Sequence, residues 1–169
     1  LGFMVHSLRS LPAIDLTDLR IGTELSEGRI PLLSDDGEYH DEMLLEGKVL
    51  LISVYDPAEL SEKEMDRIYE ERSVARAAGS RPVVVYAGEG GIYSSDKKTL
   101  MSLNRSNGGA SLIVDGQVTR KWTNANLPDA EELAMLSAED PSQLVAESEI
   151  RGRTLLGALS VVGMVLLLI

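Results

Sequence analysis

Two uninterrupted apolar runs, joined by a segment of helical character, most constrain what this chain can fold into. Lys48–Tyr55 (KVLLISVY) and Val83–Tyr86 are rich in β-branched residues, which is typical of strands buried on both faces of a sheet. Between them, Ser61 and Glu64 have the spacing of a capping box that begins a helix, and Gly79 ends it. The sequence therefore predicts a right-handed, parallel βαβ unit.

The remaining elements follow from turn residues and helical periodicity. Two Asp-Gly pairs predict tight hairpin turns, one before the βαβ unit and one after it. The helix inside the unit is expected to turn Met65, Ile68, Tyr69 and Ala75 inward. The expected hairpins are Ile30–Leu33 with Tyr39–Leu45 and Ala110–Val114 with Gln117–Trp122, and the further helices are Lys97–Asn104, capped by Ser95 or Asp96, and Asp129–Ser137.

The two ends of the chain are strongly apolar. Leu155–Ile169 is an uncharged run directly after Arg151 and Arg153, which predicts a helix that enters a lipid bilayer. Leu1–Val5 predicts the end of another membrane helix, with a signal-peptide remnant as the alternative. The expected organisation is the end of a membrane helix at 1–8, a tether at 9–28, one α/β domain at 29–139 and a long helix entering the membrane at 140–169.

Acidic residues dominate the stretch between the apolar ends. The chain has 27 Asp and Glu against 16 Lys and Arg, a formal net charge of -11. This charge disfavours a nucleic-acid partner, because phosphate recognition requires clustered cations. The cations nearest the apolar ends, Arg9, Arg151 and Arg153, all lie on the domain side, so the positive-inside tendency places the domain in the cytoplasm.

The sequence contains no cysteine. Disulfides, thiolate nucleophiles, cysteine-ligated zinc and dithiol exchange are therefore excluded for these 169 residues. The missing thiols leave the cellular compartment open, because they are compatible with either side of a membrane.

Other chemical motifs are incomplete. Gly88–Gly91 follows a strand but lacks the Lys-Ser/Thr of a phosphate-binding loop, so a flexible surface loop is expected. His40 has no nucleophile-elbow sequence beside it and is expected to be a polar strand residue. Asp35–Glu38 lacks the alternating oxygen ligands of a calcium loop and is expected to be a hairpin turn. We predict no catalytic residue, no metal site and no cofactor.

The order of the elements resembles a known fold. Glu46–Ile52 leads into the first buried strand, and Ser111–Val118 crosses the last Asp-Gly turn. These segments look like the active-site strand and the terminal hairpin of thioredoxin-like proteins, here with an extra N-terminal hairpin. The expected fold class is α/β, a thioredoxin-like mixed sheet with flanking helices, followed by a C-terminal transmembrane helix.

A narrower resemblance covers roughly residues 7 to 136. Its motifs are Ser10–Leu16, Arg20–Gly22, Lys98–Leu100, Asn104–Gly109, Asp115-Gly116 and Arg120–Trp122. They are similar to the domain attached to some bacterial DoxX-like membrane proteins, which tends to have R-S-N-P-G, a hairpin with D-G and then K-W. The resemblance implies a place in the bacterial inner membrane, with the lipid bilayer and other membrane protein subunits as partners.

The chain departs from thioredoxins where their chemistry resides. A redox-active thioredoxin has two cysteines at the start of the helix after the central strand, and this chain has Asp56–Ser61 (DPAELS) there. The loop that would carry a cis-proline contains Gly108-Gly109. The resemblance therefore implies a domain that keeps the fold and lacks the redox activity.

Four residues are candidates for partner binding. Arg105 and Asn107 stand in the loop that normally touches a thioredoxin's partner, and Asp56 stands where the cysteine motif would begin. The alternative for Asn107 is a structural role in a left-handed turn beside Gly108. Trp122 either packs against the last helix or is a half-exposed anchor for a partner.

Three functions remain open at this point. The first is a membrane-anchored, redox-inactive thioredoxin-fold module that binds or assembles partners of a DoxX-like membrane protein. The second is an accessory domain of a membrane oxidoreductase whose cofactor site lies outside this sequence. The third is a structural subunit of an envelope assembly.

Overall fold

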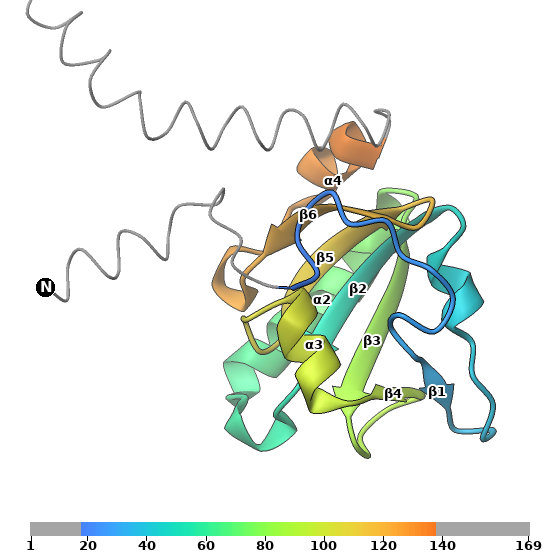
Figure 1. Ribbon diagram of the computed structural model, residues 1–169. Coiled ribbons are helices and arrows are strands. Elements are labelled where there is room, and N and C mark those ends of the chain that lie inside the picture. The colour runs from blue at the N-terminus through green and yellow to red at the C-terminus, as the bar shows by residue number, and fades with distance from the viewer. Residues whose placement is uncertain (1–17, 138–169) are drawn as a thin grey trace, which may run out of the picture.

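The computed structural model describes residues 18–137, which form one mixed β-sheet with helices on both of its faces (Figure 1). The strand order is β1-β4-β3-β2-β5-β6. The strands are β1 (Leu33–Ser34), β2 (Lys48–Val54), β3 (Arg81–Ala87), β4 (Tyr93–Ser95), β5 (Gly109–Val114) and β6 (Gln117–Trp122). The helices are α2 (Glu62–Ala77), α3 (Lys97–Leu103) and α4 (Ala130–Ser137), and the 3-10 turns are η1 (Asp41–Leu44), η2 (Pro57–Glu59) and η3 (Asn124–Asn126).

β2 is the central strand, as its unbroken apolar sequence predicts. It pairs in parallel with β3, where Leu51 lies opposite Val83, and antiparallel with β5, where Leu51 lies opposite Ser111. All residues of β2 after Lys48 are buried. The parallel βαβ unit predicted from the sequence is confirmed.

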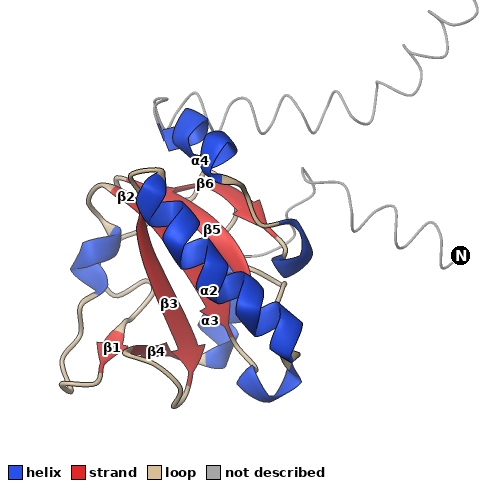
Figure 2. Cartoon of the chain, turned by 180° about the vertical axis from the view of Figure 1, so that it is seen from behind, coloured by secondary structure: helices blue, strands red, loops and turns tan. Residues whose placement is uncertain are grey.

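The sheet separates two apolar layers, because successive side chains of a strand point to opposite faces. Leu50 and Ile52 of β2 pack with α2 and α4 on one face. Leu51 packs with α3 and with the segment before β1 on the other face. Figure 2 shows α2 lying across the first of these faces. A central strand that contributes to both layers needs apolar residues at every position.

The predicted N-terminal caps of α2 and α3 are both formed by side-chain hydrogen bonds. Ser61 Oγ accepts from the Glu64 amide at 3.2 Å, and Glu64 Oε1 accepts from the Ser61 amide at 3.1 Å, which is the expected capping box of α2. Helix α3 begins after Asp96, whose Oδ2 accepts from the Thr99 amide at 3.0 Å. Of the two capping residues considered for α3, the structure thus selects Asp96 over Ser95.

The inner face of α2 differs from the expected one at two positions. Ile68 and Ala75 are buried as predicted, but Tyr69 is 54% exposed. Glu71 is buried in its place and is only 4% exposed. The spacing 68, 71, 75 follows one helical stripe, and Tyr69 lies just outside it.

The turn predicted at Asp36-Gly37 is present, but the hairpin around it is short. The Gly37 amide donates to the Ser34 carbonyl oxygen at 3.0 Å, and Leu33 and Tyr39 form a single antiparallel bridge. Strand β1 has two residues and pairs with β4 rather than with a long hairpin arm.

The expected second arm of that hairpin is wrong beyond its first residues, because the chain curls into η1. Oδ2 of Asp41 accepts from the Gly28 amide at 2.6 Å, and Leu44 is buried in the core. These two contacts turn the segment inward. His40, expected in a strand, instead precedes η1 as its N-cap residue.

Strand β4 has no counterpart among the predicted elements. It is three residues long, with Tyr93 opposite Val85 of β3 in a parallel pairing. Such a short segment cannot display the alternation of apolar and polar residues that identifies a strand in a sequence. It extends the sheet beyond β3 and provides the partner for β1.

The described part of the predicted tether packs on the domain. Leu19 is buried, the Gly22 amide donates to Val118 O at 2.7 Å, and the Leu25 amide donates to Gly116 O at 2.7 Å. This segment therefore runs beside β6 (Figure 1). The expected membrane helices at 1–8 and 140–169 lie outside the described residues, and within 18–137 no helix combines the length and apolarity needed to cross a membrane.

The topology defines the fold class. The βαβ unit places β3 beside β2 in parallel, while β5 and β6 form an antiparallel hairpin on the other side of β2, followed by α4. This is the thioredoxin-like arrangement, extended at one edge by β4 and β1. The α/β, thioredoxin-like part of the sequence prediction is confirmed by this order of strands.

Candidate functional site

The carboxyl end of β2 meets the loop that precedes β5. In open α/β sheets, ligands bind beyond the carboxyl ends of the parallel strands. Here Tyr55 and Asp56 leave β2, and the loop of residues 104–108 returns the chain to β5. We call Tyr55, Asp56 and residues 104–108 the strand-end loop site. It contains three of the four residues predicted to bind a partner.

Asn107 fixes the backbone of Asp56 at two points. Its Oδ1 accepts from the Asp56 amide at 3.1 Å, and its Nδ2 donates to the Asp56 carbonyl oxygen at 2.6 Å. The left-handed conformation belongs to Gly108, with φ of 79°, whereas among the described non-glycine residues only Asp115 has a positive φ. The left-handed turn that was the alternative role for Asn107 is therefore not found, and its side chain instead clamps the backbone of Asp56.

Two further bonds hold the loop against the end of β2. The Tyr55 hydroxyl donates to the Arg105 carbonyl oxygen at 2.8 Å. The Gly108 amide donates to the carbonyl oxygen of Ser53 at 2.6 Å. The side chain of Arg105 remains exposed while its backbone is tied down. A cationic side chain is thus carried on a fixed loop.

Asp56 supplies the opposite charge to this site. Its Oδ2 lies 3.8 Å from Nζ of Lys97, the first residue of α3, and both side chains are partly exposed. A solvent-exposed ion pair of this kind contributes between zero and about 1 kcal/mol to stability. The pair therefore places an anion at the strand-end loop site, with a cation next to it, without fixing either strongly.

Two buried asparagines, which sequence reasoning missed, support the loop from beneath. Asn104 Nδ2 donates to Ala110 O and Trp122 O, each at 3.1 Å. Asn124 Nδ2 donates to Gly108 O at 3.1 Å. Both residues are at most 5% exposed. The only available sequence signal was the concentration of asparagines around the loop, and their partners are too distant in the chain to be inferred from it.

Trp122 lies apart from the other three candidates. It is half-buried and packs against the core layer that also contains Leu133 and Leu136 of α4. Only its carbonyl oxygen reaches the strand-end loop site, through Asn104. The structure therefore brings Asp56, Arg105 and Asn107 together and places the indole ring in the α2–α4 layer. Their roles as binding residues stay predictions.

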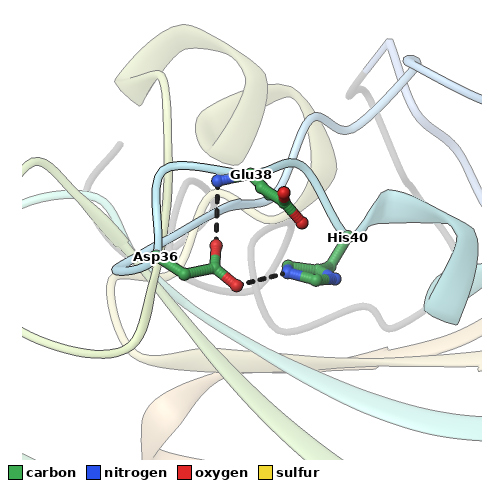
Figure 3. A group of neighbouring side chains, drawn as sticks. All are labelled: Asp36, Glu38 and His40. Carbon is green, nitrogen blue, oxygen red and sulfur yellow. Dashed lines mark hydrogen bonds and ion pairs between the residues drawn. The ribbon is translucent and has the colours of Figure 1, made fainter.

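A second group of polar side chains, Asp36, Glu38 and His40, lies at the Asp36-Gly37 turn, which we call the N-terminal turn (Figure 3). Asp36 Oδ1 accepts from the Glu38 amide at 2.8 Å, and Asp36 Oδ2 lies 3.1 Å from His40 Nε2. One ligand atom from each of these three residues lies within 4.8 Å of the others, the only such group among residues 18–137. One nitrogen and two carboxylate oxygens are donors that a divalent cation accepts.

The hydrogen bonds within this group explain its geometry without a metal ion. The Glu38 amide, followed by His40, holds the pKa of Asp36 below its ordinary value. The hydrogen bond that the Asp36 carboxylate accepts from His40 raises the pKa of His40, and the nearby Glu42 and Glu38 charges raise it further. The hairpin turn expected at Asp35–Glu38 is present, with the Gly37 amide donating to the Ser34 carbonyl oxygen.

A cavity of about 340 Å³ lies between β1 and the glycine-rich loop after β3. Its lining includes the acidic residues Asp35 and Glu89 and the apolar Ile92, but none of the four predicted binding residues. Gly91 lies so close to Tyr86 that a Cβ would come within 2.5 Å of the ring. The two acidic residues of the lining disfavour an anionic ligand such as phosphate.

Comparison with known proteins finds no family model and no curated protein sequence that matches this chain. Solved structures with a similar arrangement include a cysteine-to-serine mutant of PrxQ from Xylella fastidiosa, at 13% identity and a TM-score of 0.48, covering 72% of this chain and 98% of that one. Copper-bound ScoI from Bradyrhizobium japonicum has 12% identity and a TM-score of 0.44, covering 69% and 96%. The flavin-dependent monooxygenase PieE, in complex with FAD and substrate, has 19% identity and a TM-score of 0.41, covering 82% and 21%.

These likenesses are too distant to transfer any activity. The class of protein is defined by the strand order and by the residues at the end of β2: a thioredoxin-like α/β domain with an asparagine clamp at the position where thioredoxins carry cysteines.

Proposed function

We propose that this chain is a membrane-anchored, redox-inactive thioredoxin-fold module that binds a protein partner through the strand-end loop site. The observation that carries the proposal is the two-point clamp of Asn107 on the backbone of Asp56. It occupies the strand end with fixed, hydrogen-bonded polar groups. A site of this kind can recognise a partner surface and offers no nucleophile for disulfide exchange.

The charges at the site support recognition of another protein. Arg105 is exposed on a loop whose backbone is held by Tyr55 and Asn107. Ordering a loop on binding costs free energy, and a loop that is already fixed avoids most of that cost. Arginine is over-represented among the residues that dominate protein interfaces. The site therefore suits a partner that presents a carboxylate to Arg105.

The membrane part of the proposal is supported by the sequence. The uncharged run Leu155–Ile169 is the basis for anchoring in the bilayer. The short motifs shared with domains of DoxX-like membrane proteins support a membrane protein subunit of that kind as the partner. The arginines beside the apolar ends support a cytoplasmic position for the domain and the bacterial inner membrane as its location.

The test is co-purification of the full chain from native membranes. Arg105→Glu reverses the charge on the strand-end loop site and is expected to reduce recovery of a bound subunit at least about tenfold, the equivalent of roughly 1.4 kcal/mol. The matched control is Arg76→Glu, which makes the same change at an exposed position in the last turn of α2. Equal recovery with both variants would count against the proposal, and so would reduction of insulin disulfides by the purified full chain.

A further inference from the structure

Glu71 is a carboxylic acid in the apolar stripe of α2. Glu71 lies between Ile68 and Ala75 on the same buried face of the helix, and it is only 4% exposed. Its Oε1 atom is buried and has no hydrogen-bond partner among the described residues. Isolated carboxylates are strongly disfavoured in such surroundings, because burial removes the water that solvates the charge.

Helix α4 packs against α2, and the charges that its first turn brings near Glu71 are also negative. Asp129, directly before α4, and Glu132 in its first turn both repel a negative charge on Glu71. Glu70 on α2 itself does the same. Burial is the largest cause of the shift and these carboxylates add to it, raising the pKa of Glu71 to about 7. Ionisation of Glu71 is therefore opposed from both helices.

The nearby arginines are engaged elsewhere. Arg67 donates to Asn124 Oδ1 at 3.3 Å. The charge of Arg72 acts to lower the pKa of Tyr86. Arg120 lies opposite Leu112 in the β5–β6 pairing, on the α2–α4 face, and donates to the Thr119 carbonyl oxygen at 3.0 Å. None of these three cations is among the groups that shift the pKa of Glu71.

The ligand that fits this carboxylate is a proton. Glu71, Asp129 and Glu132 do not form a group of converging ligand atoms, since the only such group within residues 18–137 is the one around His40. A divalent cation would therefore lack the ligands it needs. Protonation, in contrast, removes the charge without any further group.

We propose that Glu71 is a proton-operated latch for α4, which stays docked on α2 while the carboxyl is protonated and is released when it ionises. Docking of α4 depends on Leu133 and Leu136, which enter the same core layer as Ile68. Within the described residues, this apolar contact is what packs α4 against the domain. Because α4 is the last described element before the expected membrane helix, the latch would link pH to the connection between the domain and the membrane.

The single tryptophan provides the readout. Trp122 packs against the core layer that also contains Leu133 and Leu136, so its emission reports a change in the packing of that layer. The full chain in detergent micelles is taken from about pH 4 to about pH 8.5, a range that includes both the ordinary pKa of a glutamate and the raised pKa of Glu71. Tryptophan emission is recorded together with hydrogen-exchange protection factors, corrected for the intrinsic pH dependence of exchange, for α4 and β2.

The latch predicts a red shift of Trp122 emission as the pH rises. Protection of α4 amides should fall by up to roughly 300-fold, while β2 stays protected. This factor follows from the rise in the pKa of Glu71 from 4.5 to about 7 when α4 is docked. Glu71→Gln, which is isosteric and neutral, should abolish both changes, and the control Glu62→Gln, at an exposed position of α2 that does not shift the pKa of Glu71, should keep them. Unchanged α4 protection in the wild-type chain, or a transition that persists in Glu71→Gln, would overturn the proposal.

Discussion

The strand-end loop site and the α2–α4 interface differ in whether their polar groups have hydrogen-bond partners. At the loop site, both backbone groups of Asp56 are bonded to Asn107, and the buried Asn104 bonds two carbonyl oxygens at once. At the interface, Oε1 of Glu71 is buried without a hydrogen-bond partner. The first region has one stable arrangement, whereas the second has an arrangement that depends on whether a proton is bound.

The difference teaches how the same fold can hold one region fixed and keep another responsive. A buried polar group with its partners in place specifies a unique conformation, and one without them costs free energy until the surroundings or the protonation state change. We therefore expect the loop site to be insensitive to pH and the interface to respond to it.

The largest effect is expected from Glu71→Gln at alkaline pH. In the native state the pKa is about 7 and in the unfolded chain about 4.5, so the native state binds the extra proton between these values. Stability should therefore fall as the pH rises from about 4.5 to about 7, by up to roughly 3 kcal/mol, and the variant should escape this loss. Chemical denaturation at about pH 8 should show the gain, and at about pH 4 the two proteins should be equal. A pH-independent difference would contradict the explanation.

Asn104→Ala should cause the second largest effect, now at the loop site. It leaves the carbonyl oxygens of Ala110 and Trp122 without their side-chain donor, and Asn104 itself is 5% exposed. The expected loss of stability is about 2 kcal/mol, with no dependence on pH. The exposed Asn126→Ala is the matched control and should stay within about 0.5 kcal/mol of the wild type. A comparable loss in both variants would remove the distinction.

Asn107→Ala should cost less, about 1 kcal/mol, because water can replace its bonds to the partly exposed Asp56 backbone. Tyr55→Phe removes one bond from the same loop and should cost about half as much. Denaturant midpoints of the two variants provide the measurement. Faster amide exchange at Asp56 in Asn107→Ala, with β3 unchanged, would locate the effect at the clamp, and unchanged exchange would exclude it.

The smallest effect concerns the exposed acids of the N-terminal turn. Asp36→Asn removes the hydrogen-bonded carboxylate that most raises the pKa of His40, so this pKa should move down toward its ordinary value. The imidazole resonance of His40, titrated by nuclear magnetic resonance, reports the change. Asp35→Asn, one residue away, is the control and should leave the midpoint in place. Equal shifts in the two variants would show that overall charge, rather than this bond, sets the value.

The sequence predicted the parts of the fold that depend on local patterns. The apolar run of β2, the capping box at Ser61 and the Asp-Gly turn before β6 each determine an element within a few residues. The prediction of the second arm of the first hairpin was wrong, because the course of this segment depends on a hydrogen bond between Asp41 and Gly28. Strand β4 is too short to show any periodicity.

The candidate site was predicted in its location but not in its construction. Asp56 and Asn107 were both named as candidates, yet the bonds between them join residues 51 positions apart and follow only from the fold. Glu71 was not identified at all, because a glutamate in the charged stretch of α2 resembles its exposed neighbours until α4 is seen to pack against α2. Local patterns specify elements, and contacts between distant segments decide which polar residues are buried.

Site-specific photocrosslinking in native membranes tests the proposed function most directly. Benzoyl-phenylalanine is placed at Arg105 on the strand-end loop site or, as the control, at Arg76 on the exposed end of α2. The account predicts a discrete adduct with a membrane protein subunit from position 105 and none from position 76. The same adducts from both positions, or an adduct from position 76 alone, would contradict it.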